Sequence, residues 1–183
     1  MPLFFNSHQP KIENKTHVIE LYSHCNKYLS QVDHEVITGT DFAPILTAEF
    51  GQNVRFVYAP GFDIYDRLIK EARSRGYTQP IINLYDPDNV KHLTSRIQPG
   101  DSLYITAQSD FEKGVIVGLD AEELVDVLLD DLELADIPLK NLDLGSCMIG
   151  RQESYREILR KGLSNFQTIT TYTDLCSAPY VDG

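Results

Sequence analysis

Cys147 is the residue of this sequence best suited to chemistry, because it stands between a predicted strand and a predicted helix. The strand covers residues 142–146, and the helix opens between residues 149 and 152. A thiol at the start of a helix has a lowered pKa, since the backbone N–H groups and the helix dipole favour the thiolate. We therefore expect a nucleophilic cysteine here. The alternative is a buried thiol that fills the end of a strand.

Small and basic residues flank Cys147 and complete this candidate site. Gly145 and Ser146 leave room for a substrate backbone, and the amides nearby are placed to form an oxyanion hole. Arg151 lies close by in sequence and adds positive charge. We expect Gly145, Ser146 and Arg151 to bind substrate.

A second segment should meet Cys147 at the same edge of the sheet. Ligands of an open parallel sheet collect outside the carboxyl ends of its strands. Residues 102–107 are a predicted strand, and Gln108, Ser109 and Asp110 follow it directly. We expect Gln108 to bind substrate, and Ser109 and Asp110 to line the catalytic site with Cys147.

Short β-branched runs alternate with helical patterns from residue 54 onward, which is typical of an α/β protein with a mostly parallel sheet. Strands are predicted at residues 54–58, 80–85, 102–107, 142–146 and 167–172, and a small hairpin at 113–118. Helices are predicted at residues 62–75, 90–95, 120–132 and 151–161. Asp120 and Glu123 have the spacing of a capping box. The expected fold is α/β, with helices on both faces of the sheet.

The first 53 residues have a different pattern. Apolar residues recur at steps of three and four between Val18 and Val32, which predicts a strongly amphipathic helix. Residues 35–38 are a candidate strand and residues 44–50 a candidate helix. We therefore expect residues 1–53 to form an N-terminal helical extension and residues 54–183 to form the α/β domain.

The sequence around Cys147 resembles a known family. Residues 142–150 (LDLGSCMIG) resemble the cysteine block of the caspase and gingipain clan, and are most similar to the inositol-phosphate-activated self-cleaving cysteine protease domains of large bacterial toxins. Residues 118–124 (GLDAEEL) resemble the helix start of those domains, and residues 100–105 (GDSLYI) the strand that delivers their catalytic histidine. The resemblance implies a caspase-like fold, a Cys147 nucleophile and a bacterial effector or toxin relative that is delivered into a host cell.

The sequence departs from that family at the histidine that serves as acid–base partner of the cysteine. Ser109 falls where the family carries this histidine, and neither serine nor glutamine transfers protons near pH 7. All histidines precede the strand in question: His8, His17, His24, His34 and His92. We therefore expect a caspase-like protein without peptidase activity that acts as a binding module. An active cysteine peptidase, with a histidine supplied from another position, is the first alternative.

Asp86 and Asp88 support a second alternative. Residues 84–88 (LYDPD) resemble the strand and Asp-x-Asp start of metal-dependent phosphatases, in which carboxylates hold Mg²⁺. That family has a threonine two positions after the second aspartate, but here Asn89 and Val90 follow Asp88. Asp-Pro-Asp is also an ordinary turn sequence. A small-molecule-binding or metal-binding α/β domain that uses Asp86 and Asp88 therefore stays open.

The composition narrows the choice of partners. The net charge is -11, and this acidic balance excludes nucleic acids and anionic membranes, because phosphate neutralisation needs a basic face. Residues 110–143 are strongly acidic, so we expect no inositol phosphate ligand. We interpret the basic cluster as a solvated helix face: Arg151, Arg156, Arg160 and Lys161.

The cysteines and histidines follow no pattern of a structural site. Three cysteines are too few for a disulfide framework, and no paired Cys/His spacing is present. We expect no cofactor and no metal, a protein or peptide partner, and a reducing, cytoplasmic compartment.

Overall fold

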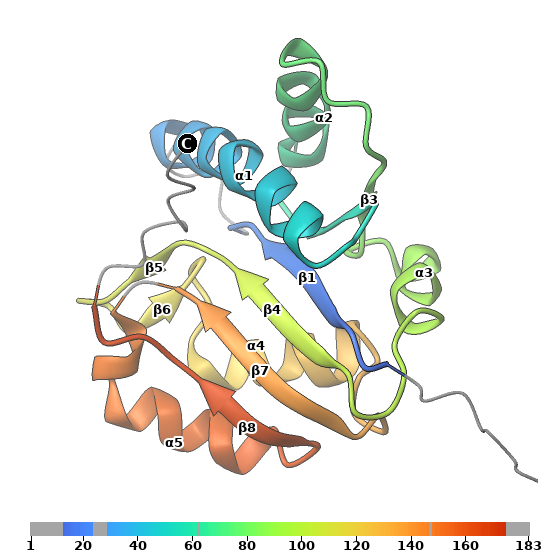
Figure 1. The fold of residues 1–183 in the computed structure, drawn as a ribbon. Helices are drawn as coiled ribbons and strands as arrows, with labels where there is room; N and C mark the ends of the chain where they lie inside the picture. The colour runs from blue at the N-terminus through green and yellow to red at the C-terminus, as the bar shows by residue number, and fades with distance from the viewer. Residues whose placement is uncertain (1–12, 24–28, 62, 147, 175–183) are drawn as a thin grey trace, which may run out of the picture.

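The computed structural model describes residues 13–23, 29–61, 63–146 and 148–174. Six strands form one parallel sheet in the order β3-β2-β1-β4-β7-β8 (Figure 1). These strands are β1 (Thr16–Leu21), β2 (Arg55–Tyr58), β3 (Ile81–Asn83), β4 (Ser102–Thr106), β7 (Leu139–Gly145) and β8 (Phe166–Thr170). A separate antiparallel hairpin pairs β5 (Ser109–Asp110) with β6 (Val115–Ile116). The α/β fold class predicted from the sequence is confirmed.

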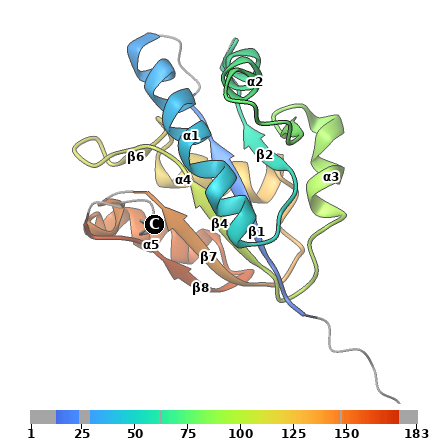
Figure 2. The same ribbon diagram turned by 45° about the horizontal axis from the view of Figure 1, so that its top comes forward.

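Helices cover both faces of the sheet, as expected (Figures 1 and 2). One face of the sheet is covered by the two helices that connect β1 to β2 and β2 to β3, α1 (Leu29–Glu49) and α2 (Ile64–Ser74). The other face is covered by the later helices α4 (Ala121–Asp126) and α5 (Glu153–Gly162). The remaining helices are short: α3 (Val90–Thr94), η1 (Pro87–Asn89), η2 (Val127–Asp131) and η3 (Ile149–Arg151).

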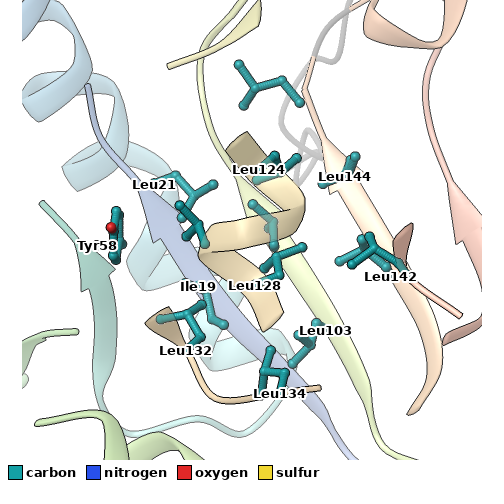
Figure 3. Packing of buried hydrophobic residues seen from close by; sticks show 14 of the residues in the cluster. Ile19, Leu21, Tyr58, Leu103, Leu124, Leu128, Leu132, Leu134, Leu142 and Leu144 are labelled. Carbon is teal, nitrogen blue, oxygen red and sulfur yellow. The ribbon is translucent and has the colours of Figure 1, made fainter. Parts of the chain in front are cut away.

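The larger core cluster lies between the sheet and the later helices. Ile19 and Leu21 point from β1 into this cluster, and Figure 3 shows them beside Leu128 and Leu132 of the chain that follows α4. Leu103 of β4 is also completely buried there. Because burial of a leucine or isoleucine contributes about 1.5–3 kcal/mol, this cluster is the main source of hydrophobic stabilisation.

The order in which successive strands are added to the sheet reverses between β1 and β4. β1 has β2 on one side and β4 on the other, so the sheet grows outward from this pair in both directions. The order is that of a doubly wound sheet, in which ligands bind outside the carboxyl ends of the strands near the reversal.

The helix predicted between Val18 and Val32 is wrong over its first part. Thr16–Leu21 is a central strand of the sheet, and the described part of the helix, α1, begins at Leu29. Five of the six residues of this strand are buried, His17 and Glu20 among them, because both of its faces are covered. Its apolar residues Val18 and Leu21 lie three positions apart, which imitates a helical spacing. The candidate strand at residues 35–38 is wrong as well, because it lies inside α1.

The strands and helices of the sheet region predicted after residue 54 are confirmed, whereas the hairpin expected at residues 113–118 pairs Ser109–Asp110 with Val115–Ile116 instead. Each predicted strand corresponds to one of β2, β3, β4, β7 and β8, with bounds that shift by a few residues. The capping box of α4 is present, since the Asp120 carboxylate accepts the Glu123 N–H at 2.8 Å and the Glu123 carboxylate faces the Asp120 N–H.

Among the described residues, no helix is long and apolar enough to cross a bilayer.

Candidate functional site

The carboxyl ends of β4 and β7 lie side by side, where the sequence predicted the site. Thr106 pairs with Gly145, and Ser146 follows directly. The Ser146 hydroxyl donates to the Ala107 carbonyl oxygen at 3.1 Å, and the side chain is completely buried. Ser146 therefore joins the two strand ends, and its hydroxyl is not on the surface that a substrate would meet.

Gly145 also packs against the neighbouring strand, where the Tyr104 side chain lies close to its Cα. A Cβ atom at this position would lie 2.6 Å from the Tyr104 hydroxyl oxygen and 2.8 Å from the ring. The space that the glycine leaves is therefore filled by Tyr104 of the neighbouring strand rather than open to a ligand.

Ser109 and Asp110 lie in the hairpin beyond β4. Asp110 pairs with Val115, and its carboxylate accepts the backbone N–H of Lys113 at 3.2 Å. This hydrogen bond, together with the Lys113 ammonium group, lowers the pKa of Asp110. Asp110 is therefore an ionised turn residue near pH 7 and unsuited to exchanging protons. Gln108 is exposed, and its carbonyl oxygen accepts the Val117 N–H at 2.7 Å.

Cys147 lies outside the described residues, but the chain on either side of it is defined. Met148 has a φ of 61°, a left-handed conformation that L side chains adopt rarely. The chain turns sharply at this point and enters η3. The helix expected to open near residue 149 is thus a single short turn before α5.

The loop after β7 pairs with the chain that follows β8. The Met148 N–H donates to the Asp174 carbonyl oxygen at 3.0 Å, and the Gly150 N–H donates to the Tyr172 carbonyl oxygen at 2.8 Å. The residue numbers run in opposite directions along the two segments, as in antiparallel strands. The amides that we expected to form an oxyanion hole therefore hold two carbonyl groups of an extended segment of the same chain.

Gly150 is required for this close approach. A Cβ atom on Gly150 would lie 2.7 Å from the Tyr172 carbonyl oxygen, a distance that real Cβ atoms do not show. Arg151 adds a third contact, because its Nε donates to the Thr173 carbonyl oxygen. The Arg151 guanidinium also lies 5.9 Å from the centre of the Phe111 ring, which connects the loop to the hairpin.

Asp143 contacts the same segment, and only one of its two carboxylate oxygens has a hydrogen-bond partner among the described residues. Its Oδ2 accepts the Tyr172 hydroxyl at 3.0 Å, whereas its Oδ1 is buried without a hydrogen-bond partner among the described residues. Burial raises the pKa of Asp143, against the effect of the Tyr172 hydrogen bond. The carboxyl group therefore takes up a proton more readily than an exposed aspartate does.

Two of the described histidines, His17 and His92, lie far from the strand ends that carry the candidate site. His17 Nε2 is 2.8 Å from Asp101 Oδ2 at the start of β1, opposite Leu103, whereas Gly145 stands opposite Thr106 at the far end of β4. His92 is exposed on α3, in the chain that leads to the start of β4.

His34 is the described histidine on the carboxyl side of the sheet. It is exposed on α1, next to Glu35, which accepts the Ser23 N–H at 3.1 Å. Burial raises the pKa of Glu35, against the hydrogen bonds from Ser23. The sequence analysis missed this Ser23–Glu35 pair at the end of β1, because it depended on the predicted helix there.

Asp86 and Asp88 form a turn. Asp86 Oδ1 accepts the Asp88 N–H at 3.0 Å, and this contact caps η1. Within the ranges that the structure describes, no three His, Cys, Asp or Glu side chains gather closely enough to hold a metal ion.

The fold and the strand-end loop define an α/β protein with a doubly wound parallel sheet and a backbone strip that holds an extended segment. No protein-family profile matches the chain, and neither does any curated protein or solved structure.

Proposed function

We propose that this chain is a caspase-like protein without peptidase activity, and that it binds an extended peptide at the loop after β7. One observation carries the proposal: the Met148 and Gly150 amides hold two carbonyl groups of residues 172–174 in antiparallel fashion. A peptide from a partner has the same carbonyl groups at the same spacing. Main-chain hydrogen bonds of this kind are a common mode of peptide recognition.

Ser109 and Asp110, the side chains expected to line the site, favour peptide binding over peptide hydrolysis. Asp110 has a lowered pKa and accepts hydrogen bonds within its own turn, and Ser109 lies in the same short hairpin. A cysteine peptidase needs a group that exchanges protons near pH 7; Asp110 is ionised there, and a serine hydroxyl does not act as such a group. The contacts of His17 are at the opposite end of the sheet.

Binding is tested with the full chain and a synthetic peptide of residues 169–174 (ITTYTD). Titration of the ¹⁵N-labelled chain, monitored by NMR, should shift the amide signals of Met148 and Gly150 first. Because the chain's own segment competes at an effective concentration in the mM range, peptide concentrations of several mM are needed. Shifts that are absent, or that are spread evenly over the molecule, would contradict the proposal.

The matched variants are Gly150→Ala and Lys140→Ala. Gly150→Ala should abolish the peptide-induced shifts, because the new methyl group occupies the space of the incoming carbonyl group. Lys140 is exposed on β7 and its replacement should leave the shifts unchanged.

Turnover separates this proposal from the active-peptidase alternative. The chain and its Cys147→Ala variant are incubated with fluorogenic casein, and both should release no fluorescence above buffer. Cleavage by the parent chain that Cys147→Ala abolishes would establish the hydrolase alternative instead.

A further inference from the structure

A groove of about 340 Å³ runs between α5 and the outer edge of β8, and it ends at Thr171, beside Gly150 of the loop after β7. Arg156 and Arg160 line it from the helix, and Gln167 and Thr168 line it from the strand. β8 is the last strand of the sheet, and α5 runs beside it (Figure 1). A volume of this size is typical of small-ligand and side-chain pockets.

The two arginines of this groove are without acidic partners. Arg156 is half-buried, and its Nε is buried with no hydrogen-bond partner among the described residues. Arg160 is exposed, and neither arginine forms an ion pair with a described carboxylate, although the chain has 27 acidic residues. A buried donor without a partner is unfavourable, and an anionic ligand would supply the missing acceptor.

Some other arginines of the chain form ion pairs, whereas Arg73, Arg96 and Arg151 donate to neutral oxygens. Arg55 and Arg75 each contact a carboxylate, Glu20 in one case and Asp41 in the other. The sequence interpretation of Arg156 and Arg160 as a solvated helix face therefore needs correction for Arg156, whose guanidinium group is partly removed from solvent.

The strand side of the groove is suited to a peptide main chain. Within the described part of the chain, β8 pairs with β7 alone, so its other edge presents backbone groups outward. Residues 166–170 (FQTIT) contain no proline and no charged residue, which are the usual means of blocking an exposed edge.

We infer that this groove binds an extended acidic peptide, whose main chain adds to β8 and whose carboxylates are received by Arg156 and Arg160. The spacing agrees with this ligand, because arginines four residues apart on a helix are separated by about 6 Å along its axis. Acidic residues at alternate positions of a strand are separated by about 7 Å, which is similar. Guanidinium groups bind carboxylates in a bidentate manner, and this geometry favours arginine over lysine.

A second copy of this chain is a poorer occupant of the groove. β8 contains no acidic residue, so two copies joined edge to edge would bring their Arg156 and Arg160 side chains together without counter-charges. The groove adjoins the loop after β7 at Thr171, but the inference rests on Arg156, Arg160 and β8 and does not depend on the proposed function.

The test uses the full chain and a fluorescein-labelled peptide, Thr-Val-Glu-Val-Glu-Val-Thr, with fluorescence polarisation as the readout. The matched peptide has glutamine in place of both glutamates. We expect saturable binding of the acidic peptide and at least tenfold weaker binding of the glutamine peptide. Equal affinity for both peptides, or no binding of either, would refute the inference.

Three variants locate the binding: Arg160→Gln, Arg156→Gln and Lys161→Gln. Arg160→Gln should weaken the acidic peptide about fivefold, as expected for one charge-assisted hydrogen bond at a partly exposed site. Arg156→Gln should weaken it further, and circular dichroism melting checks that this variant folds. Lys161 is exposed on the same helix and outside the groove, so Lys161→Gln should leave the affinity unchanged. Equal losses in Arg160→Gln and Lys161→Gln would show unspecific charge attraction and would also refute the inference.

The oligomeric state is the final control. Sedimentation of the chain should give a monomer with or without peptide. A dimer that Arg160→Gln stabilises and acidic peptide does not disrupt would identify a second copy as the occupant.

Discussion

In the half of the sheet built from β1, β2 and β3, charged side chains are buried as a pair. In the half built from β4, β7 and β8, Asp143 and Arg156 are half-buried, and neither forms an ion pair with a described residue. Arg55 donates two hydrogen bonds to Glu20, at 2.8 and 3.0 Å, and the Tyr22 hydroxyl donates a third at 2.6 Å. Asp143 and Arg156 each retain a buried polar atom without a partner among the described residues.

The comparison separates groups that hold the fold from groups that are open to a ligand. The Glu20 carboxylate accepts three hydrogen bonds, so it has little capacity left for a partner, although Arg55 Nη1 is itself unpaired among the described residues. Asp143 and Arg156 lie near the extended segment and the groove, where an added ligand or a proton can complete their bonding. Three substitutions test this difference.

Glu20→Gln should have the largest effect. Removing the charge of Glu20 leaves Arg55 buried without a counter-charge, and breaking a buried ion pair in this way costs about 3–5 kcal/mol. The free energy of unfolding in urea measures the loss. Asp33→Asn is the matched control, since the exposed Asp33–Arg67 pair should contribute about 1 kcal/mol or less. Equal effects of both substitutions would argue against the paired role of Glu20.

Asp101→Asn should have an intermediate effect that depends on pH. Burial opposes the charge of Asp101, but hydrogen bonds from the Gln98 N–H, His17 and the Lys15 N–H together lower its pKa. A lowered folded-state pKa stabilises the fold above the ordinary aspartate pKa of about 3.9, and this stabilisation disappears as pH falls further. The substitution should cost about 1–3 kcal/mol at pH 7.

Unfolding curves of the parent chain and Asp101→Asn between pH 7 and about pH 3 measure this dependence. The difference between them should shrink at the acid end. A difference that stays constant over the whole range would mean that the charge of Asp101 is unimportant and that only its shape matters.

Asp143→Asn should have the smallest effect, with the opposite sign. Because burial raises the pKa of Asp143, the ionised carboxylate favours the unfolded chain above the ordinary aspartate pKa, and stability is lost as pH rises. Asparagine can still accept the Tyr172 hydroxyl, so the variant should gain up to about 1 kcal/mol at pH 7 and nothing near pH 3. Thermal melting at both pH values measures the gain. Destabilisation at pH 7 would place Asp143 with Glu20, as a group that holds the fold.

The second half of the chain was the more predictable part of the fold. Its strands have different environments on their two faces, as in β4, where buried Leu103 and Ile105 alternate with half-buried residues. β1 is buried on both faces, so its buried positions follow one another without such alternation, and the charged Glu20 is among them. The sequence therefore indicated the wrong kind of element at Thr16–Leu21.

The candidate site was predicted at the correct edge of the sheet, but not with the correct roles. Gln108 and Arg151, both predicted to bind substrate, are exposed, and Arg151 contacts the extended segment. Ser146 is buried against Ala107, and the space beside Gly145 is filled by Tyr104. Small residues at a strand end are compatible with substrate access and with tight packing, and only the neighbouring strand distinguishes the two. Cys147 lies outside the described residues, so its nucleophilic role stays a prediction.

The sequence by itself determined the features that depend on near neighbours: the α/β alternation after residue 54 and the capping box of Asp120 and Glu123. The tertiary structure decided which strands are neighbours, that Met148 and Gly150 hold residues 172–174, and that Arg156 lies half-buried beside β8. The physical reason is the range of the interactions. Periodicity and caps depend on contacts within a few residues, whereas pairing partners more than 20 residues apart are chosen by the packing of the whole sheet.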